Sequence, residues 1–80
     1  MTPHEARYLA KYKPNSPESE TDELCCAYCC EWSPLFNWTI EPEYCETCGG
    51  YNAMCCPECE ETNGSVHTHD DAIQVRKAET

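Results

Sequence analysis

The apolar pattern of the first 13 residues predicts a short amphipathic helix. Tyr8, Leu9 and Tyr12 fall on one face at helical spacing. Thr2 followed by Glu5 is a capping-box sequence, which starts helices, and the prolines that follow position 13 end this one. A helix of about ten residues is marginal alone, so it either docks on the rest of the protein or binds a separate partner.

Residues 14–24 are mostly polar and acidic, and they predict a solvated linker with no apolar anchor. Further on, Phe36, Trp38 and Ile40 alternate with polar residues, which is the period of a half-buried strand. Trp32 lies outside that run, so we expect it to be an exposed contact residue.

The tail allows two interpretations. Ile73 and Val75 alternate with polar residues, which favours a short closing strand, whereas Asp70 and Asp71 would suit the start of a short helix. We favour the strand, and we expect residues 77–80 to be frayed.

Size and composition restrict what can hold such a chain together. Eighty residues form one domain at most, and its cysteine-rich part buries too little apolar surface to fold without metals, disulfides or a partner. The polar N-terminus lacks a secretory signal, and no run approaches a membrane span. We therefore expect an intracellular protein, cytoplasmic or nuclear, in which thiols stay reduced and clustered cysteines hold metal.

The cysteines supply the candidate chemistry. Nine of them fall between Cys25 and Cys59, and an odd number leaves one unpaired in any complete disulfide scheme. Two residues between cysteines allow both sulfurs to reach one zinc ion. Three such C-x2-C pairs and one His-x-His pair make four ligand pairs, enough for two tetrahedral Zn²⁺ ions: Cys26 and Cys29, Cys45 and Cys48, Cys56 and Cys59, His67 and His69.

The ligand pairs can be shared in two ways. In a sequential scheme the first two pairs hold one zinc and the last two hold the other. In an interleaved cross-brace the first and third pairs share one ion, and the second and fourth share the other. Each of Cys25, Cys30 and Cys55 adjoins a proposed ligand, so each either replaces that neighbour as a ligand or is a small buried residue beside the metal.

Charge limits the partner classes. Fifteen acidic against five basic residues give a formal net charge of −10, which repels phosphate backbones. We therefore expect a protein–protein interaction module that binds a protein or a basic peptide and not nucleic acid. The alternative is an acidic inhibitor or regulator of the viral or phage type that acts by charge mimicry of nucleic acid.

The ligand surplus argues against catalysis. Catalytic zinc keeps an open position for water, usually beside three protein ligands. The H-x-E sequence that precedes P-C-x-x-C in zinc deaminases is missing here. Closed structural sites and no enzymatic activity are therefore expected. A role like that of cross-brace ubiquitin ligases is a minor alternative, although their usual central histidine is absent.

Residues 25–76 resemble the ZZ-type zinc finger. The resemblance rests on the stretch from Cys45 to Cys59, the His-x-His pair that follows it, the earlier C-x2-C, and Tyr51 in place of a central tyrosine. It implies a small zinc-stabilised, treble-clef-like cross-brace with short β-hairpins and two zinc ions, preceded here by the short N-terminal helix. By position, it implies an all-cysteine site of Cys26, Cys29, Cys56 and Cys59 and a mixed site of Cys45, Cys48, His67 and His69. The acidic residues with which many ZZ domains grip a peptide N-terminus are missing from this segment.

Overall fold

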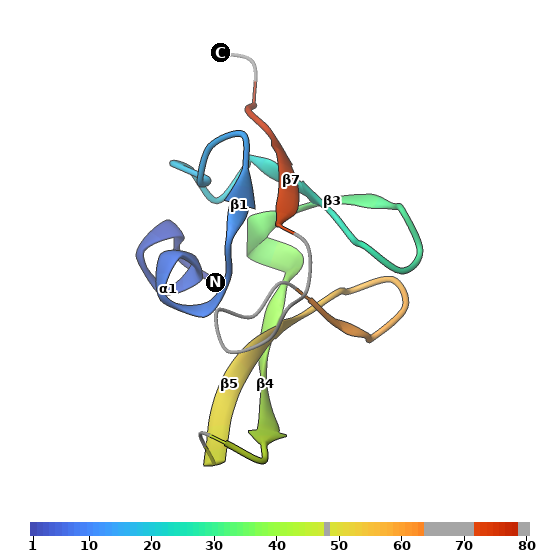
Figure 1. Ribbon diagram of the computed structural model, residues 1–80. Coiled ribbons are helices and arrows are strands. Elements are labelled where there is room, and N and C mark those ends of the chain that lie inside the picture. Colours follow the sequence, from blue (N-terminus) through green and yellow to red (C-terminus); the bar gives the residue numbers. More distant parts are fainter. Residues whose placement is uncertain (48, 64–71, 79–80) are drawn as a thin grey trace.

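The protein consists of two small β-sheets and one short α-helix, seen in a computed structural model that describes residues 1–47, 49–63 and 72–78 (Figure 1). A four-stranded sheet has the order β1-β7-β2-β3, and a three-stranded antiparallel sheet has the order β4-β5-β6. The elements are α1 (Pro3–Leu9), β1 (Tyr12–Lys13), β2 (Glu23–Cys25), β3 (Trp32–Pro34), the 3₁₀ helix η1 (Leu35–Asn37), β4 (Thr39–Cys45), β5 (Gly49–Cys55), β6 (Thr62–Asn63) and β7 (Ile73–Arg76).

The first sheet joins the two ends of the chain. β7 pairs in parallel with β1, where Tyr12 lies opposite Ile73, and antiparallel with β2, where Leu24 lies opposite Val75. The predicted closing strand is therefore confirmed. β7 also lies in the middle of its sheet, which buries Ile73.

Helix α1 is shorter than predicted. Its capping box forms as expected: the Thr2 hydroxyl accepts from the Glu5 amide at 3.2 Å, and the Glu5 carboxylate accepts from the Thr2 amide at 3.1 Å. The helix nevertheless ends at Leu9, because Ala10 is extended and the following residues pair with β7. Ala6 is fully buried in the core, so the docked form of the helix is the one observed.

One apolar core connects the helix, both sheets and two cysteines. Trp38 is almost fully buried, and its indole Nε1 donates to the Ser33 carbonyl oxygen at 3.1 Å. Within the described ranges, no helix is long and apolar enough to cross a bilayer. The buried residues of the core are Ala6, Ala10, Leu24, Cys26, Leu35, Trp38, Met54, Cys56 and Ile73.

The predicted strand around Trp38 is only partly correct. Residues Leu35–Asn37 form η1 instead, since the Leu35 amide donates to the Asp22 carbonyl oxygen and draws the chain into a turn. β4 starts at Thr39, while Phe36 and Ile40 remain exposed. Trp32, expected to be exposed, is half-buried, because the Arg76 guanidinium lies 4.5 Å from its ring centre.

Residues 14–24 are not a solvated linker throughout. Asp22 is 3% exposed, and its carboxylate accepts from the amides of Glu18 at 2.8 Å, Ser19 at 3.1 Å and Ala78 at 2.8 Å. The acidic segment is thus folded back around one buried carboxylate that also ties down the chain after β7. Sequence alone placed Asp22 among solvated acids, because nothing nearby marks it as the one that is buried.

We predict that Asp22→Asn destabilises the protein by about 1–3 kcal/mol, because an amide cannot accept from all three donors. Burial alone would raise the pKa of the Asp22 carboxyl, but the three amides and Lys77 lower the pKa below its usual value. The stabilisation is therefore complete above the ordinary aspartate pKa and is lost as pH falls through the lower folded-state pKa.

Urea unfolding across pH measures this effect, with Glu20→Gln as the control at a nearby exposed carboxylate. The stability gap between wild type and Asp22→Asn should close in acid, while Glu20→Gln should show no gap. A gap that stays constant below pH 4 would contradict the role given to the Asp22 carboxylate.

Candidate metal centre

Two loops of the same construction approach each other from different sheets. We call residues 25–31 the first knuckle and residues 55–61 the second knuckle. Each contains two adjacent cysteines, two further residues, another cysteine and, two positions later, a glutamate. The first knuckle begins at the last residue of β2 and the second at the last residue of β5, so each sheet carries one knuckle.

The same two backbone hydrogen bonds close both knuckles. In the first, the Cys30 amide donates to the Cys26 carbonyl at 3.0 Å, and the Cys26 amide donates to the Glu31 carbonyl at 3.1 Å. In the second, Glu60 and Cys56 donate in the same way to Cys56 and Glu61, both at 3.0 Å. Cys30 and Glu60 each have a φ of 62°, the left-handed conformation that lets the chain turn out of the loop.

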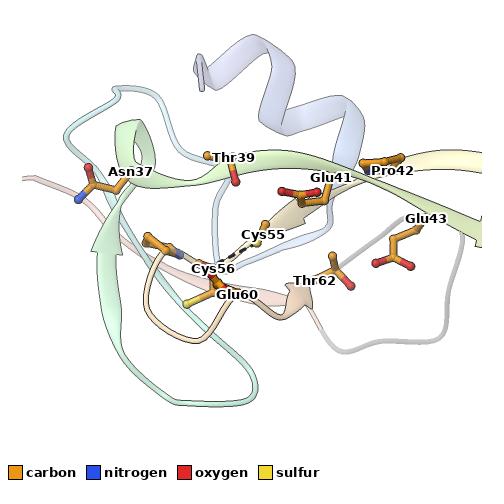
Figure 2. A pocket seen from close by; sticks show the side chains of 10 residues that line it. Asn37, Thr39, Glu41, Pro42, Glu43, Cys55, Cys56, Glu60 and Thr62 are labelled. Atoms are coloured by element: carbon orange, nitrogen blue, oxygen red, sulfur yellow. Dashed lines mark hydrogen bonds between the residues drawn. The ribbon is translucent and has the colours of Figure 1, made fainter.

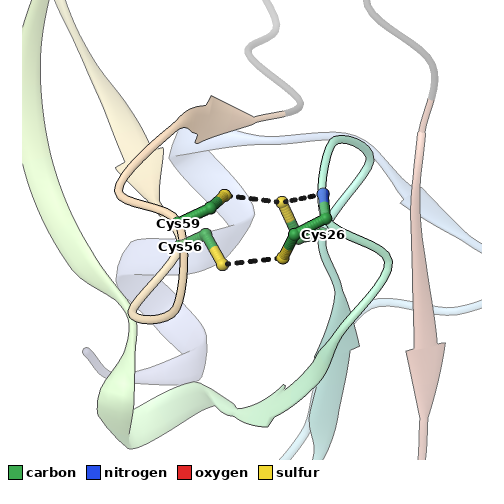
Figure 3. A group of neighbouring side chains, drawn as sticks. Cys26, Cys56 and Cys59 are labelled. Atoms are coloured by element: carbon green, nitrogen blue, oxygen red, sulfur yellow. Dashed lines mark hydrogen bonds between the residues drawn. The ribbon is translucent and has the colours of Figure 1, made fainter.

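The knuckles bring four thiols together (Figure 3). Cys26 Sγ lies 3.5 Å from Cys59 Sγ, and Cys29 Sγ lies 3.7 Å from Cys56 Sγ. All four sulfurs lie within 4.8 Å of one another, and all four cysteines are free thiols. Two sulfurs bound tetrahedrally to one zinc at about 2.3 Å would be about 3.8 Å apart, whereas disulfide sulfurs are about 2 Å apart. The spacing fits a metal and not a disulfide.

Hydrogen bonds lower the pKa of the Cys26 thiol. Burial raises the pKa of the Cys26 thiol, but the amides of Cys29 and Tyr28 and the side chain of Asn63 donate to its sulfur and lower the pKa to about 7. At the matching position of the second knuckle, burial raises the pKa of the Cys56 thiol. Because a metal binds thiolates, the donors to Cys26 Sγ favour the form of this sulfur that binds a metal.

Asn63 joins the two knuckles and was not found by sequence analysis. It is 1% exposed; its Oδ1 accepts from the Ala27 amide at 2.8 Å, and its Nδ2 donates to Cys26 Sγ at 3.4 Å and to the Glu61 carbonyl at 3.0 Å. A single asparagine after the second knuckle carries no spacing signal. The 30-residue repeat of the knuckles is visible in the sequence, however, and directs attention to the residues that follow each one.

We predict that Asn63→Ala weakens metal binding by about 10–100-fold, the usual loss when a group that orients a metal ligand is removed. The matched control is Asn52→Ala, an exposed asparagine on β5. Competition with a chromophoric zinc chelator measures both affinities. Equal affinities for the two variants would show that Asn63 does not organise the sulfurs.

The remaining predicted ligands are placed only in part. Cys45 ends β4 opposite Gly49, while Cys48, His67 and His69 lie outside the described residues. Within the described part of the chain, the metal-ligand group holds the first and third C-x2-C pairs without Cys45. This is the grouping of the interleaved scheme.

The three extra cysteines take different positions. None of them belongs to the group of four sulfurs that could hold a metal ion. Cys55 is buried and Cys25 is half-buried, and burial raises the pKa of both thiols. Cys30 is exposed, which corrects the expectation that all three are small buried residues beside the metal.

No protein-family model matches this chain, and neither curated proteins nor solved structures gave a match.

Proposed function

We propose that the protein is a non-enzymatic, zinc-binding interaction module whose Cys26, Cys29, Cys56 and Cys59 hold one structural Zn²⁺. The observation that carries the proposal is the approach of four free thiols to the spacing of a tetrahedral Zn–S₄ site. Four cysteines complete the coordination and leave no open position for water, which argues against a catalytic zinc. All-sulfur ligation favours Zn²⁺ over the hard cations Ca²⁺ and Mg²⁺.

A second Zn²⁺ completes the proposed cross-brace. Its ligands are Cys45, Cys48, His67 and His69, the pairs left over once the first and third have been used. The grouping of Cys26, Cys29, Cys56 and Cys59 supports this ZZ-like arrangement, because it leaves the second C-x2-C pair and the His-x-His pair for one another.

The proposed partner is a basic protein segment. No lysine or arginine occurs between positions 14 and 75, and residues 39–63, which include the whole β4-β5-β6 sheet, contain six glutamates. A pocket of about 590 Å³ lies on this sheet beside the second knuckle (Figure 2). Glu41 and Glu43 from β4 and Glu60 from the knuckle line it, so a lysine or arginine side chain entering it would meet only acidic charge.

Two triple variants with the same charge change test this assignment. The first variant replaces three glutamates that line the pocket: Glu41→Gln, Glu43→Gln, Glu60→Gln. The second variant replaces three exposed glutamates that do not line it: Glu20→Gln, Glu31→Gln, Glu46→Gln. The probe is a synthetic lysine- and arginine-rich peptide titrated by calorimetry. We expect the first variant to bind about tenfold more weakly than the second, which corresponds to about 1.4 kcal/mol.

Equal weakening of the two variants, together with a steep loss of affinity in salt, would instead favour the charge-mimicry alternative, because only total charge would then matter. No binding by the wild-type protein would count against a basic partner altogether.

A further inference from the structure

Strand β4 lies at the edge of its sheet. In the described part of the chain it pairs with β5 on one side and with no strand on the other. The residues from Thr39 to Tyr44 are all exposed to solvent. An edge strand presents backbone amides and carbonyls with which a further extended chain can pair.

The even-numbered residues of β4 direct their backbone groups away from β5. A Cβ placed on Gly50 would lie 3.9 Å from the Glu43 carbonyl oxygen, so this carbonyl points toward β5. Because backbone groups alternate in direction along a strand, those of Ile40, Pro42 and Tyr44 point outward. Proline has no amide, so its outward position leaves the pairing with β5 intact. The open edge therefore offers the carbonyls of these residues and the amides of Ile40 and Tyr44.

The two faces of β4 differ in chemistry. Glu41 and Glu43 lie on one side of the strand and Pro42 on the other, and both glutamates line the pocket of about 590 Å³ (Figure 2). The face that carries Pro42 also carries Ile40, which is 39% exposed, and Tyr44, which is 73% exposed. A strand added at this edge would contact carboxylates with one set of alternate side chains and apolar side chains with the other.

The same edge disfavours a second copy of this chain. If two copies of β4 paired antiparallel about Pro42, Glu41 of each copy would lie opposite Glu43 of the other. Like charges directly opposite each other destabilise a strand pair, and the central prolines would donate no hydrogen bond. The edge therefore suits a strand of opposite charge.

We propose that the basic partner binds as an extended segment that adds an antiparallel strand to the open edge of β4. Lysine or arginine side chains at alternate positions lie opposite Glu41 and Glu43, and the apolar side chains between them lie beside Ile40 and Tyr44. The antiparallel direction continues that of the other strand pairs in this sheet. The occupant is the basic partner of the proposed function, on which this inference rests, with its conformation and residue pattern now specified.

Two peptides of equal length and composition test the proposal on the full-length, metal-loaded protein. Lysine and valine alternate in one peptide, whereas the lysines precede the valines in the other. The alternating order allows every lysine to face a glutamate while the backbone pairs with β4. We expect calorimetry to give about tenfold tighter binding for the alternating peptide.

Backbone methylation of the alternating peptide supplies a matched pair of probes. In an antiparallel strand pair, the valines opposite Ile40 and Tyr44 direct their amides toward β4, and the lysines direct theirs away. Methylation of the valine amides should therefore weaken binding about tenfold, whereas methylation of the lysine amides should leave it almost unchanged.

Hydrogen exchange locates the bound peptide on the protein. Saturation with the alternating peptide should slow the exchange of the Ile40 and Tyr44 amides about tenfold, because they become hydrogen-bonded. The Glu41 and Glu43 amides already face β5 and should change little.

Charge reversal tests the side-chain contacts. The double variant Glu41→Lys, Glu43→Lys should lose the lysine–valine peptide and bind a peptide in which glutamate and valine alternate. The control Glu20→Lys, Glu31→Lys has the same charge change at exposed sites outside β4 and should keep its preference for the lysine–valine peptide.

Three results would contradict the proposal in different ways. Equal affinity for the two lysine–valine orders, or equal effects of the two methylations, would overturn strand addition and leave the basic partner in place. No binding of any lysine peptide would remove the proposed partner as well. Protection of the Ile40 and Tyr44 amides that rises with protein concentration, without peptide, would show that a second copy occupies the edge.

Discussion

Removal of the metal is expected to unfold the protein. Two of the four proposed ligands, Cys26 and Cys56, are fully buried members of the same core as Leu24, Leu35 and Trp38. Without an ion, the core would bury Cys26 and Cys56 with only weak sulfur–sulfur contacts between the two knuckles. Structural zinc supplies on the order of 10–16 kcal/mol in zinc-finger peptides at neutral pH, at least as much as the about 5–15 kcal/mol of net stability of a typical domain.

Amide NMR spectra with and without a strong zinc chelator measure this effect. The dispersed signals of β2, β5 and the two knuckles should collapse on chelation under reducing conditions and return when zinc is added. The near-UV circular dichroism of buried Trp38 should disappear in parallel. An apo protein that kept its signal dispersion would show that the apolar core is sufficient and that the metal is incidental.

The second large effect is the different result expected when serine replaces Cys56 or its neighbour Cys55. Cys56→Ser should abolish metal binding at the four-sulfur centre and unfold the apolar core around it at 25 °C, because serine replaces a buried thiolate ligand, while the second proposed site keeps its own ion. Cys55→Ser changes a buried thiol that makes only weak hydrogen bonds, one of them a donation to the Cys56 carbonyl oxygen at 3.7 Å. That variant should stay folded and keep its metal, with a stability loss of about 1–3 kcal/mol.

The pair of variants is a matched test, because both change one sulfur to one oxygen at neighbouring positions. Thermal unfolding and metal content are measured on each. If Cys55→Ser lost the metal and Cys56→Ser kept it, the ligand register would be wrong by one residue. If both kept the metal, the four-sulfur centre would not be where the ion binds.

Sequence spacing was sufficient to mark the C-x2-C pairs as candidate metal ligands, but it left their grouping open and gave no sign of the bonds around them. C-x2-C spacing depends only on local chain geometry, so Cys26, Cys29, Cys56 and Cys59 could be named in advance, and the resemblance to ZZ fingers implied their grouping. The bond from Asn63 to Cys26 joins residues 37 positions apart, and no local pattern reports it.

In the fold as well, features set by neighbouring residues could be predicted from the sequence, and features set by distant residues could not. The capping box of α1 and the alternation in β7 are local and were predicted correctly. The end of α1, by contrast, depends on pairing between β1 and the distant β7, and the turn at η1 depends on the Asp22 carbonyl oxygen. The alternation of Phe36, Trp38 and Ile40 predicts a strand, because a local sequence pattern carries no information about tertiary hydrogen bonds.

Native mass spectrometry of protein purified under reducing conditions tests the central claim most directly, by counting zinc in the wild type and in the double variant Cys29→Ser, Cys59→Ser. The cross-brace account predicts two ions in the wild type and one in the double variant, since both changes fall on one site. Wild-type protein without zinc, with a mass lower by two hydrogens for each cysteine pair, would contradict the account and make the protein a disulfide scaffold.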